Sequence, residues 1–243
     1  MSDAGSPGDR TAPLDDDRRT WLSVDLVAIT DDPHDPALVL YRRGHAPHQG
    51  VLSLPGAVMD PARAQTVSET ARWIAAERAH ARVVTGTEPF PIAVVSDPRR
   101  DERGHTVSLV TVCRVHAPDA DSAAVLVRHA DQLPTTMPFG HGPMLTAAAR
   151  RAYDTVFTDP EVARALVSTD ADHAITATGL FSTLRILHRL SGVAPADEPT
   201  PEAIRRRRSR SPLLAAAGTV RSVTRPETVY VATVGGLPVS ATR

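Results

Sequence analysis

The chain has 243 residues, of which 42% are hydrophobic and 23% are charged, a composition typical of a folded globular protein. This length is enough for one large domain or two small ones. The single cysteine, Cys113, excludes an intrachain disulfide and a zinc site of several thiolates, and we expect it to pack as a small apolar residue in a reducing cytoplasm. No apolar run approaches the ~20 residues of a membrane span, so we expect no membrane association.

Charge is distributed unevenly although the net formal charge is only −1. From residue 199 to the end, eight arginines and two glutamates give +6, whereas the rest of the chain has 19 arginines and 26 acids and carries −7. Five of the C-terminal arginines lie within positions 205–210. Such a cluster either neutralises the phosphates of a nucleic acid and releases counterions, or forms a solvated basic surface.

In chain order, residues 1–20 are rich in Asp, Gly, Pro and Arg, and we expect them to be a disordered leader. Runs of β character and one helical pattern follow, in which Val67, Ala71 and Ile74 share a face. The expected elements are strands at 21–30 and 37–42 that form a hairpin, a helix at 66–80, strands at 91–96 and 106–116 around a polar loop, and a helix at 120–130. This order predicts an α+β fold with a mixed sheet and helices on its faces.

The remainder of the chain predicts helices followed by a short β end. A helical connector covers 143–157 and 161–167, and a helix at 177–190 places four leucines on one side. Thr200 is a good N-cap and Pro201 follows it, so the arginine cluster begins one turn inside a helix. Pro212 limits the C-terminal end of this helix. Strands at 219–222 and 227–232 complete the order helix, turn, basic helix and β-hairpin, which is the order of a winged helix-turn-helix.

Residues 44–60 read GHAPHQGVLSLPGAVMD, and with the strand before them and the helix after them they resemble the entry to a Nudix fold. The Nudix box is G-x5-E-x7-R-E-U-x-E-E-x-G-U, where U is a bulky aliphatic residue, and its glutamates hold a divalent metal against a substrate diphosphate. With Ala57 at the box glycine, the first glutamate position falls on Arg63. One extra residue before the helix aligns Arg72 with the box arginine, Ile74 with the aliphatic residue and Glu77 with a glutamate, while Trp73 and Ala76 replace two acids.

The altered box has lost most of the carboxylates that a metal site needs. Mg²⁺ prefers octahedral oxygen ligation, so Glu77 alone is a poor site, and Glu69 lies eight residues earlier, ~80° around the helix axis. Arg72 and Glu77 are either remains of the metal site or a structural pair that braces the helix on the loop, and we favour bracing. We therefore expect no catalytic residue, no cofactor and no bound metal, with Glu77 as the only metal-binding remnant.

Beyond the box, the chain resembles the Nudix-related transcriptional regulators over about residues 21–231. These proteins combine a Nudix-like domain, a helical connector and a C-terminal winged helix, and three strings agree in order: SDPRRDER at 96–103, MPFGH at 137–141 and ITATGLFSTLRIL at 175–187. The resemblance implies a homodimeric repressor of NAD-metabolism genes that binds double-stranded DNA and senses a small nucleotide effector, ADP-ribose or a related NAD metabolite. The implied domains are a sensor at 21–142, a connector at 143–168, a winged helix at 169–234 and a tail at 235–243.

The expected ligand-binding residues lie at strand ends and turns of the Nudix-like domain. Arg42 and Arg43 end the second strand, where a guanidinium grips a diphosphate by paired hydrogen bonds or simply lies in solvent. The loop at 97–105, which includes Arg100, is either a binding loop or an ion-paired surface turn. The complete set is Arg42, Arg43, Gly56, Arg72, Asp97, Arg99 and Asp101.

The expected DNA-binding residues lie in and after the basic helix. Because the arginines at 205–208 cover a full helical turn, some should contact phosphates, one or two should reach base edges, and the rest should be solvated. His141, in the string MPFGH, is expected to be a hinge or cap residue. The DNA-binding set is Thr200, Arg205, Arg206, Arg207, Arg208, Arg210, Arg221 and Arg225.

Two other functions remain open beside a DNA-binding regulator. A Nudix hydrolase that cleaves a nucleoside diphosphate derivative would rebuild its metal site from Glu69, Glu77 and a loop acid such as Asp60 or Asp101. A protein-binding adaptor would use the inactive domain as a platform. The regulator is our leading hypothesis because the box acids are missing and the C-terminal helix is basic.

Overall fold

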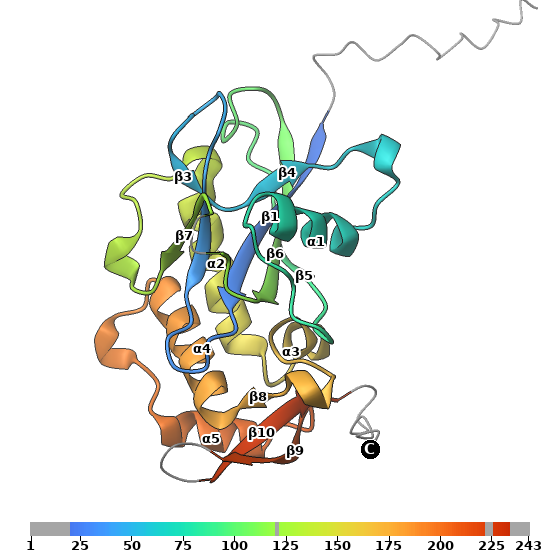
Figure 1. Cartoon of the computed structure of the whole chain (residues 1–243). Coiled ribbons are helices and arrows are strands. Elements are labelled where there is room, and N and C mark those ends of the chain that lie inside the picture. The colour runs from blue at the N-terminus through green and yellow to red at the C-terminus, as the bar shows by residue number, and fades with distance from the viewer. Residues whose placement is uncertain (1–19, 120–121, 222–225, 234–243) are drawn as a thin grey trace, which may run out of the picture.

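The long strand β1, Trp21–Thr30, is the centre of the main sheet in the computed structural model, which describes residues 20–119, 122–221 and 226–233 (Figure 1). Its eight residues from Ser23 onward are buried, which is typical of a strand covered on both faces. β1 pairs in parallel with β6, Thr106–Val115, and antiparallel with β2, Leu38–Arg42, so the sheet is mixed. The other strands are β3 (Leu52–Ser53) and β7 (Ala124–Val127) beside β2, β4 (Gly56–Val58) beside β1, and β5 (Phe90–Val95) beside β6.

Helices cover both faces of this sheet. α1, Val67–Glu77, begins with a capping box in which the Thr66 hydroxyl accepts the N–H of Glu69, and the Glu69 carboxylate accepts the N–H of Thr66. The buried side of α1 packs on one face of the sheet. α2, His141–Thr155, and α3, Pro160–Leu166, pack on the opposite face (Figure 1). The predicted α+β fold with a mixed sheet and flanking helices is confirmed.

The C-terminal unit, residues 169–233, contains two longer helices and a small sheet. α4, Ala177–Leu190, is followed by α5, Pro201–Ser209, and the hydroxyl of Thr200 accepts the N–H of Ala203 as the predicted N-cap. The strands are β8 (Ile175–Thr176), β9 (Leu214–Arg221) and β10 (Pro226–Ala232), in the order β8-β10-β9. The order of helix, basic helix and β-hairpin is the one that the sequence predicts.

One hydrophobic core extends from the main sheet into the C-terminal unit. It joins Ile29 of β1 to Leu184 of α4 and Leu214 of β9. In addition, the N–H of Ala232 in β10 donates to the carbonyl of Ser168, just after α3, at 2.9 Å. The two parts of the chain are therefore packed together rather than joined by an extended linker.

The predicted helix at 120–130 is wrong. Ala124–Val127 form strand β7 and Ala130–Gln132 form a single 3-10 turn, while residues 120–121 lie outside the described part of the chain. β7 pairs with β2 through the register Leu38↔Val127, so a short β-branched run completes an edge of the sheet. Strand pairing with β2 and burial outweigh the helical pattern here, because neither a cap nor a long apolar face stabilises a helix in this segment.

The remaining differences concern short elements and boundaries. Strands β3, β4 and β8 have only two or three residues, too few to show an alternating pattern, and β9 begins at Leu214 rather than 219. The leader at 1–19, the tail from residue 234 and the turn at 222–225 lie outside the described residues. None of the helices in the described ranges has the length and hydrophobicity that a bilayer span requires.

Candidate functional site

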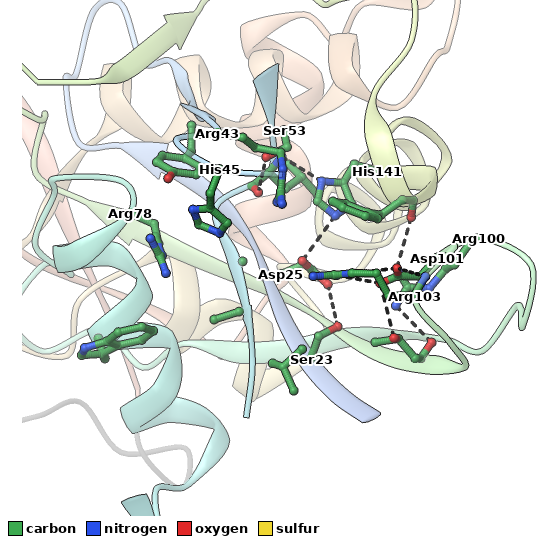
Figure 2. A pocket seen from close by; sticks show the side chains of 18 residues that line it. Ser23, Asp25, Arg43, His45, Ser53, Arg78, Arg100, Asp101, Arg103 and His141 are labelled. Carbon is green, nitrogen blue, oxygen red and sulfur yellow. Dashed lines mark hydrogen bonds and ion pairs between the residues drawn. The ribbon is translucent and has the colours of Figure 1, made fainter. Parts of the chain in front are cut away.

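A pocket of about 260 Å³ opens where β1, β4, the end of α1, the 97–105 loop and the start of α2 meet (Figure 2). Four arginines and two aspartates are among its lining residues, which gives a positive balance of formal charge. We call it the arginine pocket. Its charged residues are Arg43, Arg78, Arg100, Arg103, Asp25 and Asp101, and its other lining residues include Ser23, Tyr41, Gly56, Trp73, Phe139 and His141.

The buried carboxylate of Asp25, on β1, forms the floor of the arginine pocket. The hydroxyl of Ser23 donates to Asp25 Oδ2 at 3.0 Å, and the hydroxyl of Ser108 donates to the same oxygen. His141 Nε2 lies 3.4 Å from Asp25 Oδ1, and its Nδ1 accepts the N–H of Leu54 at 3.0 Å. That backbone donor assigns the ring proton to Nε2, so His141 presents an N–H to the carboxylate.

This network controls the ionisation of Asp25. Burial by itself raises the pKa of Asp25, but the hydrogen bond from His141 and those from Ser108 and Ser23 outweigh burial and hold the pKa below its usual value. The carboxylate is therefore ionised at neutral pH although it is buried. Figure 2 shows this carboxylate among the labelled arginines, with Arg43 and Arg78 on one side and Arg100 and Arg103 on the other.

Gly56, which the sequence predicts in the site, lies in the register position opposite Asp25, on β4. A Cβ atom at this position would lie 2.1 Å from Asp25 Oδ1 and 3.2 Å from the carbonyl oxygen of Val24. A side chain therefore does not fit while the carboxylate keeps its place. The glycine is needed for the close approach of the two strands.

Two arginines of the pocket contact the ring of Phe139. The guanidinium carbons of Arg43 and Arg103 each lie 4.8 Å from the ring centroid. Arg103 also donates to both oxygens of the buried Asp101, at 2.9 and 2.7 Å. Burial lowers the pKa of Arg43, and the nearby charge of Arg103 lowers it further. An anion between the two guanidiniums would relieve this repulsion.

Arg100 connects the 97–105 loop to the floor of the pocket and to the start of α2. It donates to Ser108 Oγ at 2.7 Å, to the carbonyl of Thr106 at 3.1 Å and to the carbonyl of Phe139 at 3.1 Å. Its Nε is buried and has no hydrogen-bond partner among the described residues. This N–H is therefore an unsatisfied buried donor beside the pocket.

The mouth of the pocket combines a cation with two aromatic rings. The guanidinium of Arg78 lies 5.9 Å from the ring centroids of both Tyr41 and Trp73. Trp73 stands on α1 at the position where the Nudix box has an acid. The mouth of the pocket therefore presents two aromatic rings beside a guanidinium.

Three of the seven residues expected to bind a ligand line the arginine pocket, namely Arg43, Gly56 and Asp101. Arg42 donates to the carbonyl of Gly50 at 2.8 Å, and Asp97 accepts the N–H of Arg99 in an exposed turn. These three residues lie outside the pocket lining.

Arg72 also lies outside the lining and braces α1. It donates to the carbonyl of Thr87 at 2.8 Å and pairs with Glu88 at 2.9 Å. The expected bracing role is thus realised through Glu88, whereas the exposed Glu77 does not take part in these contacts.

The acids of a rebuilt metal site are not assembled. The Glu69 carboxylate accepts the Thr66 N–H and hydroxyl at 2.8 Å, and Asp60 caps the 3-10 turn after β4 by accepting the N–H of Ala62. Asp101 is held by Arg103. Within the described ranges, no group of three or more His, Cys, Asp or Glu is arranged to hold a metal ion. The residues present do not fit Mg²⁺, which requires several oxygen ligands.

The basic helix α5 presents its arginines in different environments. Arg205 and Arg206 are exposed, and Arg205 pairs with Glu202. Arg208 is half-buried and lies 4.9 Å from the ring centroid of Tyr230 on β10. Arg210 is exposed at the C-cap. The side chain of Arg221 and the whole of Arg225 lie outside the part of the chain that the structure describes.

Arg207 differs from its neighbours because it turns inward. It donates to the carbonyl of Tyr153 at 2.9 Å and to the carbonyl of Asp154 at 3.0 Å, both in the last turn of α2. Its guanidinium also lies over the rings of Tyr153 and Phe157, at 4.8 and 5.1 Å from their centroids. The side chain is therefore occupied by an internal contact, in contrast to the DNA contact expected from the cluster.

Solved structures of Nudix-type proteins are similar to this chain. No protein-family model and no curated protein matches it. Shewanella oneidensis NrtR is 21% identical, with a TM-score of 0.63 and coverage of 87% of this chain and 94% of that one. The same protein complexed with a 27mer DNA is 20% identical, with a TM-score of 0.63 and coverage of 87% and 93%. A MutT/nudix family protein from Enterococcus faecalis is 16% identical, with a TM-score of 0.59 and coverage of 90% and 89%. Over most of its length, the chain therefore has the fold of NrtR, a Nudix-type sheet and helices continued into the C-terminal unit.

Proposed function

We propose that this protein is a DNA-binding transcriptional regulator whose arginine pocket binds a small anionic nucleotide such as ADP-ribose. The observation that carries the proposal is the pocket itself, where four guanidiniums converge and the box-helix acids Glu69 and Glu77 do not belong to the lining. The C-terminal unit would act as a winged helix, and the regulator would work as a cytoplasmic homodimer and a repressor of NAD-metabolism genes.

The chemistry of the pocket favours a diphosphate. Guanidiniums bind phosphate oxygens through paired hydrogen bonds, and Arg43 and Arg103 both line the pocket beside Phe139. The volume of about 260 Å³ is at the lower end for ligand sites, so the pocket accommodates the diphosphate while the rest of the nucleotide extends toward Trp73 at the mouth.

Two observations support DNA binding by α5. Arg205 and Arg206 are exposed on a capped helix, and exposed arginines supply the electrostatic part of nucleic-acid affinity. The similar fold of NrtR has been solved in complex with a 27mer DNA. A winged helix would place α5 against the duplex with the β9–β10 hairpin beside it.

The test combines selection of genomic DNA with a ligand titration. The purified chain is mixed with fragmented genomic DNA of its source, bound fragments are sequenced, and the affinity for the best fragment is measured with and without ADP-ribose. We expect one fragment to bind at least 100-fold more tightly than random DNA, because specific and non-specific affinities usually differ by more than this factor. Binding with no preference for any fragment would refute the regulator.

We further propose that the pocket binds its nucleotide without hydrolysing it. Hydrolysis in a Nudix fold requires several carboxylates around a divalent metal, and Glu69, Asp60 and Asp101 are held in three separate contacts. Incubation with ADP-ribose and Mg²⁺ should release no AMP above the rate measured without protein. Release that Glu77→Gln abolishes would instead establish a hydrolase.

A further inference from the structure

Helix α2 contacts the arginine pocket at one end and the basic helix α5 at the other. Its first residue, His141, lies against Asp25 in the pocket floor, and its last turn holds Arg207 of α5. With 15 residues, α2 spans about 22 Å at 1.5 Å per residue. A single rigid element therefore connects the two sites on which the proposed function rests.

The pocket end of α2 is fixed by contacts to pocket arginines and by a constrained backbone. Phe139 has φ 57° and ψ 23°, in the left-handed region that a residue with a bulky side chain rarely adopts, and Gly140 follows with φ 69°. The ring of Phe139 contacts the guanidiniums of Arg43 and Arg103, and its carbonyl accepts from Arg100. Three pocket arginines thus maintain this turn.

The other end of α2 is fixed by Arg207. The carbonyls of Tyr153 and Asp154 lie in the last turn, where no further residue of the helix can donate to them, and the guanidinium of Arg207 satisfies both. A cation is also favourable at this end of the helix dipole. Tyr153 contacts His188 of α4 edge-on, with 5.2 Å between ring centroids. Movement of this end of α2 would therefore move both helices of the C-terminal unit.

We infer that α2 transmits the occupancy of the arginine pocket to α5, with Phe139 and Arg207 as the positioning residues at its two ends. A bound diphosphate attracts Arg43 and Arg103 and weakens their hold on the Phe139 ring. The turn before α2 then relaxes, α2 shifts along its axis, and Arg207 carries α5 with it. This inference rests on the proposed function because it needs an anionic ligand in the pocket and a functional α5.

Amide hydrogen exchange of α5 tests the link, with ADP-ribose as the probe and calorimetry to measure its affinity. In the wild-type chain, saturation with ADP-ribose should change the exchange rate of residues 201–209 by threefold or more. Arg207→Gln should abolish this change while the affinity for ADP-ribose stays within twofold. Arg206→Gln removes the same charge one residue earlier, from an exposed side chain, and should keep the change. A full response in Arg207→Gln would overturn the inference, as would a wild-type chain that binds the probe without a response in α5.

A second experiment, without ligand, tests the connection through α2 independently of the proposed ligand. Phe139→Leu keeps an apolar side chain but removes the ring that both guanidiniums contact, so it should change the exchange of residues 201–209 by at least twofold. In the double variant Phe139→Leu with Arg207→Gln, the Phe139 substitution should have no further effect on α5, because the two act through one element. Additive effects of the two substitutions on the exchange of residues 201–209 would overturn the inference. Failure of ADP-ribose to bind, with the ligand-free coupling intact, would instead refute the proposed ligand alone.

Discussion

Removal of the Asp25 carboxylate should destabilise the fold strongly, and the structure gives the magnitude. Asp25→Ala leaves three donors without their acceptor, namely the Ser23 and Ser108 hydroxyls and the Nε2–H of His141. The two hydroxyl oxygens are 2.6 Å apart, so one hydroxyl can donate to the other, and two buried donors remain unsatisfied. At roughly 1–3 kcal/mol each, and with the desolvation of the carboxylate relieved, we expect a loss of about 2–3 kcal/mol.

The assay is equilibrium unfolding in urea at pH 7, with the wild-type chain and Asp25→Asn as references. The free energy of unfolding in water should fall by about 2–3 kcal/mol in Asp25→Ala with little change in the slope. A loss below about 1 kcal/mol would refute the view that the hydroxyls and His141 depend on this carboxylate.

The pH dependence of the difference in unfolding free energy between the wild-type chain and Asp25→Ala is a separate check. Because the pKa of Asp25 is lower in the folded chain than its ordinary value of 3.8, its ionised form contributes stability that is fully present above that value. This contribution is lost as the pH falls through the folded pKa. The stability difference between the wild-type chain and Asp25→Ala should therefore be constant from pH 7 to about pH 5 and shrink at lower pH. A difference that grows on acidification would contradict the sign of the pKa shift.

Three further predictions follow from the pocket and the basic helix. Gly56→Ala should lower the free energy of unfolding by about 1–3 kcal/mol, measured in urea, because the added methyl group has no space. Arg78→Met should weaken ADP-ribose binding about tenfold in calorimetry without changing the melting temperature, because the side chain lies at the pocket mouth. Replacement of Arg205, Arg206 and Arg208 by alanine should reduce the slope of log affinity for DNA against log salt by up to about 3.

Controls make these predictions specific. Gly142 has no atom within 4 Å of an added Cβ and, like Gly56, no positive φ, so Gly142→Ala tests the addition of a methyl group without a clash. Arg99 is an exposed arginine outside the pocket, and Arg99→Met should leave the affinity for ADP-ribose unchanged. For DNA, an unchanged salt slope in the triple variant would remove α5 from the interface.

Much of the fold is predictable from the sequence because its main elements carry strong local signals. The helix at 177–190 agrees with α4 in both bounds, and Thr200 caps α5 as predicted. Strand β7 is the exception, since its four residues are fixed by pairing with β2, a contact that no local pattern reveals. In such short elements, tertiary contacts determine the structure.

The site is less predictable because it depends on contacts between distant segments. The sequence points to Arg43, Gly56 and Asp101, which lie near recognisable turns and strand ends. Asp25 and Ser23 alternate within a buried apolar strand, and two polar residues at i and i+2 on one face of β1 are the signal that would have found them. The inward turn of Arg207 follows from the packing of α5 on α2, so no count of arginines in a cluster distinguishes it from its neighbours.

The continuous core between the main sheet and the C-terminal unit limits how this protein can be divided or recombined. A chimera that exchanges the region after residue 168 for that of a related protein would remove α4 from the side of α2 on which it packs, unless the replacement restores that contact. Isolated halves should consequently aggregate or melt at lower temperature than the whole chain, and the intact chain should unfold in one cooperative transition. In the proposed regulator, diversification of target sites is then expected through surface changes on α5 rather than through the shuffling of whole domains.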